Sequence, residues 1–76
     1  MIDIDSYRIH VERGPANCSA FSPDVQGCVA TGSTVDECIA EMRSALEFHF
    51  EGMRMYGEPI PEPSGPGVYV EPEAAA

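Results

Sequence analysis

Three cysteines and two histidines are the residues with the strongest potential for metal binding, redox chemistry or catalysis. Cys18, Cys28 and Cys38 are spaced ten residues apart and include no C-x-x-C pair, so their spacing fits no zinc-ligand pattern. Their odd number prevents a complete set of intramolecular disulfides. We therefore expect three small, buried, apolar thiols in a protein of a reducing, cytoplasmic compartment.

The histidines and carboxylates give no enzymatic motif. His10 falls on the polar face of a predicted strand, and His49 falls in the apolar stripe of a predicted helix, where we expect a core-edge role. The sequence has no Gly-rich phosphate loop, H-E-x-x-H or G-x-S-x-G motif. Most acidic residues have simpler roles as helix caps or as a solvated face. We predict no catalytic residue, no metal and no cofactor, and therefore no enzyme.

Alternating residue types predict the strands that would position these groups. Tyr7–Arg13 alternates between apolar and polar residues, which is typical of a half-buried strand, and Gly14-Pro15 ends it. Weaker patterns over residues 16–22 and 28–31 predict two more strands. A loop is expected between them, with Ser22-Pro23-Asp24 at one end and Gly27 at the other. Val68–Val70 is expected to form a fourth short strand.

A capping box predicts where the one long helix begins. The Thr34 hydroxyl is placed to accept from the amide of Glu37, and the Glu37 carboxylate to reach back to the Thr34 amide. Apolar residues then recur at spacings of three and four up to about Tyr56, and Gly57 follows as a stop. Phe48, Met55 and Tyr56 lie off this stripe, which indicates a dimer contact or a cover by the following proline-rich connector.

The order β-β-β-α-β predicts an α+β two-layer sandwich, an antiparallel sheet with the long helix on one face. We expect a single domain over residues 1–76, with a structured core over about 5–71 and a tail at 72–76. The apolar runs are too short for a membrane span, and the N-terminus does not resemble a signal peptide.

The net charge indicates which classes of partner are favoured and which are disfavoured. Thirteen acidic residues against four basic ones give a net charge of −9. Nucleic acids and anionic membranes require clustered basic residues, so we expect neither as a direct partner. The charge favours a basic protein, although acidity also serves simply to keep a small domain soluble. Because a chain of 76 residues has a marginal core, we also expect a homodimer or higher oligomer.

Taken in order, the motifs resemble the HicB-like antitoxin family. Its pattern runs P-D-L-P-G-C-x-x-x-G-D-T, then an E-A-capped helix, then G-x-x-I-P-x-P. This sequence has Pro23-Asp24-Val25-Gln26-Gly27-Cys28, then the helix, then a closing Gly57-Glu58-Pro59-Ile60-Pro61-Glu62-Pro63. The likeness covers roughly residues 5–71. Gln26 stands where the family usually carries a second proline, which loosens the loop slightly.

The resemblance implies an antitoxin that covers the active surface of a small basic, RNA-cleaving HicA-like toxin. Many members carry a DNA-binding module after the last strand. This sequence ends at Ala76, so the resemblance implies a domain of the N-terminal type without that module. In the family the toxin contacts lie on the sheet and its flanking loops. Asp24 is our predicted partner-binding residue, with a backbone-bonding turn role as the alternative. A stand-alone oligomeric module that binds another protein or a small ligand is the alternative function.

Overall fold

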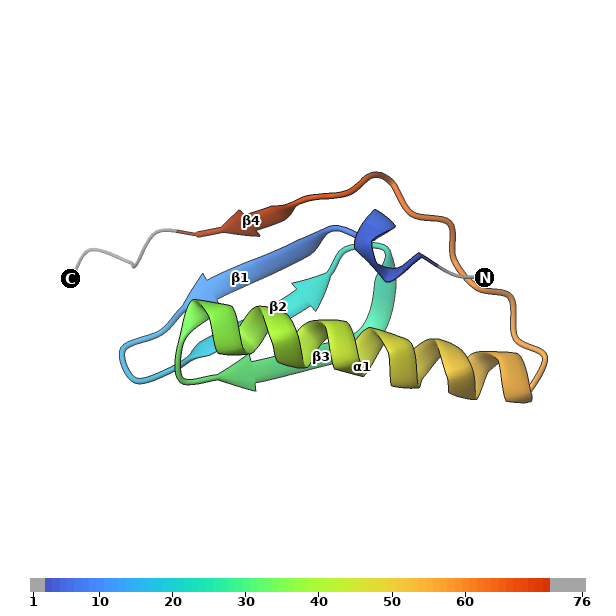
Figure 1. Cartoon of the computed structure of the whole chain (residues 1–76), viewed down its shortest axis with the longest axis horizontal. Coiled ribbons are helices and arrows are strands. Elements are labelled where there is room, and N and C mark those ends of the chain that lie inside the picture. Colours follow the sequence, from blue (N-terminus) through green and yellow to red (C-terminus); the bar gives the residue numbers. More distant parts are fainter. Residues whose placement is uncertain (1–2, 72–76) are drawn as a thin grey trace.

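The computed structural model describes residues 3–71, and the predicted tail at 72–76 lies outside this range. A short 3-10 turn, η1 (Ile4–Ser6), precedes strands β1 (Ile9–Arg13), β2 (Cys18–Ser22) and β3 (Val25–Gly32). The long helix α1 (Val35–Met55) and the short strand β4 (Val68–Val70) follow. The α+β class is confirmed: one helix covers one face of a four-stranded sheet (Figure 1).

The sheet is mixed rather than antiparallel as predicted. Its strand order is β3-β2-β1-β4, and β4 pairs with β1 in parallel. The two hairpins make β1 and β3 run the same way, and α1 then carries the chain back along the sheet. The next strand therefore runs in the direction of β3 and of β1. The predicted antiparallel sheet missed the reversal that the helix introduces.

The second hairpin differs from the predicted long loop. Only Pro23 and Asp24 form the turn, and β3 already begins at Val25. Ser22 pairs with Val25 while its neighbour Phe21 pairs with Val29, so three residues of β3 bulge out of register. Gly27 lies within this bulge at φ 80°, a left-handed conformation that favours glycine. The bulge lets β3 turn both Val25 and Cys28 into the core.

The helix begins as predicted, with one difference in its cap. The Thr34 hydroxyl accepts from the Glu37 amide at 3.1 Å. The Glu37 carboxylate, however, accepts from the amide of Ser33 at 3.1 Å rather than from that of Thr34. The start of α1 also lies against Gly32. A side chain there would place its Cβ 2.7 Å from the Cys38 amide nitrogen, so only glycine allows this approach.

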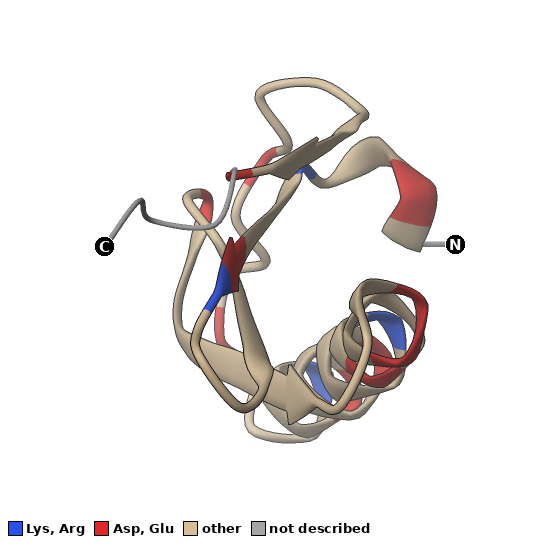
Figure 2. Ribbon diagram, turned by 90° about the vertical axis from the view of Figure 1, so that its left-hand side faces the viewer, with Lys and Arg blue, Asp and Glu red and all other residues tan. Residues whose placement is uncertain are grey.

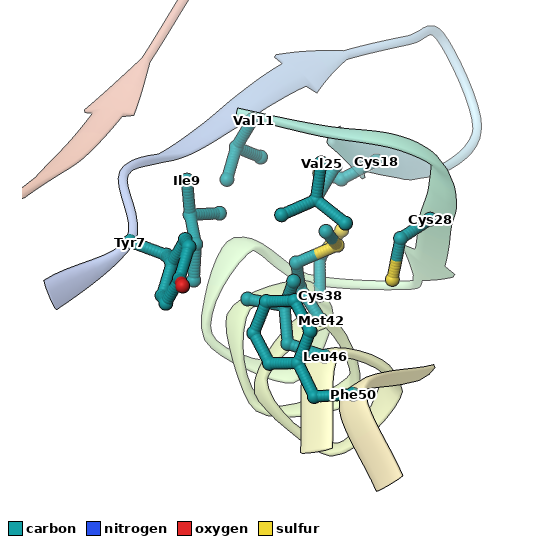
Figure 3. Close-up of a cluster of buried hydrophobic side chains, with 11 residues drawn as sticks. Tyr7, Ile9, Val11, Cys18, Val25, Cys28, Cys38, Met42, Leu46 and Phe50 are labelled. Atoms are coloured by element: carbon teal, nitrogen blue, oxygen red, sulfur yellow. The ribbon is translucent and has the colours of Figure 1, made fainter. Parts of the chain in front are cut away.

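The core lies between α1 and the inner face of the sheet (Figure 3). The inward residues of β1 and β2 follow the predicted alternation, and the three thiols are buried as expected. Burial raises the pKa of the Cys28 and Cys38 thiols, which keeps them protonated and unreactive. The helix contributes one line of side chains at i, i+4 spacing: Cys38, Met42, Leu46 and Phe50.

Candidate functional site

Asp24, the predicted partner-binding residue, lies in the β2–β3 turn and fastens the proline-rich connector, the segment between α1 and β4, to the sheet. Its Oδ2 accepts from the Ser64 amide and from the Ser64 hydroxyl, both at 2.9 Å. The bond from the Ser64 amide, with further help from the Ser64 hydroxyl and the charge of Arg8, lowers the pKa of the Asp24 carboxyl. The Asp24 carboxylate therefore bonds a residue distant in the sequence. A contact of Asp24 with a partner stays a prediction.

Tyr7 fixes the same connector from the core side. Its hydroxyl donates to the carbonyl of Pro61, and its ring packs on Phe50 with centroids 4.8 Å apart. Burial, and secondarily the charges of Asp24 and Glu62, raises the pKa of the Tyr7 hydroxyl, so it remains a donor at neutral pH. The contacts of Tyr7 and Asp24 together hold the connector in place. The connector in turn positions β4 beside β1 at the edge of the sheet.

The parallel pairing of β4 completes a row of side chains across the outer face of the sheet, the face turned away from α1. His10 of β1 is directly opposite Phe21 of β2 and Tyr69 of β4, and Phe21 is opposite Val29 of β3. The His10 ring lies 5.1 Å from the Phe21 ring and 5.4 Å from the Tyr69 ring, measured between centroids. We call these four residues the outer row.

The outer row is accessible because α1 packs only on the opposite face of the sheet (Figure 2). Val29 is 69% exposed, Tyr69 53% and Phe21 36%. Aromatic side chains on a rigid surface bury large areas at little cost in conformational entropy, which is why they are enriched in protein interfaces. This arrangement suits recognition of another macromolecule or a flat ligand, and it offers no paired nucleophile and base.

The residue pattern predicted His10 on the polar face of one strand and a second strand over residues 16–22, which contains Phe21, but it did not combine the two residues into a row. Alternation alone puts Phe21 and Val29 on the solvent side, and two apolar residues there were a usable signal. Tyr69 joins them only through the parallel register with β1. A strand of three residues carries no sequence information about that register.

Among the residues first considered for chemistry, His49 has a structural position at the edge of the core. His49 is half-buried and meets the edge of Phe50, with ring centroids 6.2 Å apart, as expected for a core-edge residue. Within residues 3–71, no three histidine, cysteine or acidic side chains come together in a way that could hold a metal ion. Over the same residues, no helix is long and apolar enough to cross a membrane.

The comparison with known proteins decides the family. Residues 7–73 match the model of the HicB-like antitoxins of bacterial toxin–antitoxin systems. The chain belongs to the HicB-like antitoxin family. Among curated proteins, it is similar to the uncharacterized 14.9 kDa protein in the rep–hol intergenic region of Haemophilus phage HP1 (strain HP1c1). The two are 34% identical over 56 residues, which cover 74% of this chain and 42% of the phage protein. No solved structure matches the chain.

The chain thus spans about two fifths of the length of that phage relative. Membership in the family makes an antitoxin role the starting point for function. The expectation that this domain acts without a DNA-binding module stays a prediction.

Proposed function

We propose that this HicB-like antitoxin binds and occludes a small basic, RNA-cleaving toxin of the HicA-like kind, and that the outer row is the centre of the contact. The observation that carries the proposal is an aromatic row left uncovered on a rigid sheet face of an antitoxin-family domain. Central aromatic residues account for most of the binding energy in many interfaces.

Charge supports a basic partner rather than a nucleic acid. The chain carries a net charge of −9 and only four basic residues, so binding to phosphates would be opposed by repulsion. A toxin that binds RNA needs a basic surface, and the acidic antitoxin attracts that surface over long range. We therefore expect association with the toxin to slow as salt is added, because ions screen the attraction.

The first experiment is recovery of the tagged full-length chain from its native host, with identification of any protein present in near-equal amount. A small basic partner is expected, and adding the antitoxin to it should stop its cleavage of RNA. If a partner without RNA-cleaving activity is recovered, or if excess antitoxin leaves the cleavage unchanged, the proposal is wrong.

Paired variants test the surface. Tyr69→Ser removes an aromatic ring from the outer row, whereas Phe48→Ser removes a still more exposed ring from the helix on the other layer. We expect Tyr69→Ser to raise the dissociation constant of the toxin complex about tenfold or more, as for a hot-spot residue. Phe48→Ser should leave it unchanged. Equal effects of the two substitutions would remove the outer row from the contact.

A stand-alone oligomeric module is the second candidate, and one observation favours it. Phe48, Met55 and Tyr56 of the helix region remain 80%, 77% and 82% exposed, which is unusual for a monomer of this size. Recovery of this chain alone from the host, as a stable oligomer, would favour that role over toxin binding.

A further inference from the structure

A carboxylate lies beside the outer row on the same open face of the sheet. Glu12 follows His10 by two residues on β1 and is opposite Ser19 of β2. Alternation therefore places Glu12 on the same face as His10, about 7 Å further along the strand. Glu12 and Ser19 are both exposed. The aromatic outer row thus has an acidic and polar neighbour on the side toward the end of β1.

Glu71 brings a second carboxylate to this place. It follows Tyr69 by two residues, and its amide donates to the Val11 carbonyl at 2.8 Å. That bond continues the parallel pairing of β4 with β1 beyond Val70. In this register Glu71 lies beside Glu12, on the face that carries Tyr69, and neighbouring strands are about 4.8 Å apart. Backbone pairing therefore makes the two glutamates neighbours.

No cation of the described residues is placed to offset this pair of glutamates. The one ion pair among residues 3–71 joins α1 to η1 and involves neither of them. Arg13 follows Glu12, but it is opposite the buried Cys18, so alternation assigns it to the other face of β1. Arg8 lies just before β1, where its charge acts on Asp24. Like charges side by side on neighbouring strands destabilise a sheet, so a cation from outside would be stabilising between them.

We propose that Glu12 and Glu71, together with the rings of His10 and Tyr69, form a binding site for an arginine side chain of the basic partner. We call these four residues the arginine subsite. The inference rests on the proposed function, because it names the group of the toxin that the sheet face receives. The carboxylates bond to the guanidinium, and the neighbouring rings offer its planar face an aromatic surface.

The chemistry of the subsite favours arginine over lysine. A guanidinium carries five donors in one plane, so it bonds two carboxylates at once and stacks on a ring, whereas an ammonium is a compact, strongly hydrated charge. The aromatic part is fixed by strand pairing, with the His10 and Tyr69 rings 5.4 Å apart between centroids. An RNA-cleaving toxin needs cations to hold phosphates, and arginine binds carboxylates in the same way as phosphates. The subsite would therefore engage such an arginine in place of RNA.

The experiment measures the affinity of the full chain for the basic partner recovered from the host, by titration calorimetry. Glu12→Gln and Glu71→Gln should each raise the dissociation constant about tenfold or more, because each removes a charge that meets the guanidinium. Glu47→Gln is the matched control, since it removes the same charge from an exposed position of α1. It should raise the dissociation constant less than about twofold, because only a screened, long-range attraction is lost.

Thermal unfolding of the same variants separates a contact from a role in folding. Removal of either Glu12 or Glu71 relieves the repulsion between them, so Tm should stay the same or rise. Weaker binding with an unchanged or higher Tm identifies a contact with the partner. A lower Tm in both variants would contradict the repulsion on which the subsite depends, and the proposal would be wrong.

Substitutions in the partner identify the group that enters the subsite. Each arginine of the partner is replaced in turn by lysine, which keeps the charge and removes the planar fork. One replacement should weaken binding about tenfold and add little when the chain already carries Glu12→Gln, because both changes remove the same contact. Full additivity with Glu12→Gln for every arginine would overturn the proposal.

The proposed function and the arginine subsite fail in different ways. If no basic, RNA-cleaving partner is recovered, the proposed function is wrong and the subsite falls with it. If such a partner binds and Tyr69→Ser weakens the complex, the outer row is part of the contact. Should Glu12→Gln and Glu71→Gln then behave like Glu47→Gln, the arginine subsite alone is refuted.

Discussion

Removing a single hydroxyl should loosen the connector and, with it, the edge of the outer row. In Tyr7→Phe the ring keeps its packing on Phe50 while the hydrogen bond to the Pro61 carbonyl is lost. A hydrogen bond contributes roughly 1 kcal/mol net to the free energy of unfolding. The substitution leaves the carbonyl of half-buried Pro61 without its donor, so we expect a loss toward the upper end of the usual range for one hydrogen bond. For a domain of this size, about 1 kcal/mol corresponds to a fall in Tm of about 4–8 °C.

Two measurements on Tyr7→Phe separate a local effect from a global one. Thermal unfolding reports the loss of stability, and hydrogen exchange reports where the structure opens. We expect the largest increase in exchange at the Glu71 amide, which donates to the Val11 carbonyl at 2.8 Å beyond the end of β4. Tyr69→Phe is the control because that ring is half-exposed, and its Tm should stay nearly unchanged. If Tyr7→Phe changed neither Tm nor exchange at Glu71, the anchoring role of Tyr7 would be refuted.

Four further predictions follow from burial and charge. Leu46→Asp places a charge at a fully buried helix position and should prevent folding, as judged by circular dichroism, since truncation of such a leucine alone removes about 2–5 kcal/mol. Ser22→Ala should keep or raise Tm, because the buried Ser22 hydroxyl has no partner among residues 3–71. The three thiols should react with a thiol reagent many times faster in urea than in buffer, and fast labelling in buffer would contradict their burial. Because the fold lowers the pKa of Asp24, stability should fall as pH drops below the ordinary carboxyl value of 3.8, and Asp24→Asn should flatten that part of the pH profile of Tm.

The elements with strong periodicity were predictable from sequence. The inward residues of β1 and the helix with its Thr34 cap were predicted and confirmed, because alternation and capping are local properties. The direction of β4 was predicted wrongly, and the β2–β3 loop was predicted too long. Both depend on pairing between distant segments, which local patterns do not report.

The candidate site was less predictable than the fold for the same reason. Asp24 was singled out by its place in a loop that flanks the sheet, and the structure shows its carboxylate bonded to Ser64, forty residues away. The outer row depends on three strand registers at once, and each residue in it is unremarkable alone. Its apolar members on a solvent face were nevertheless visible in the sequence pattern.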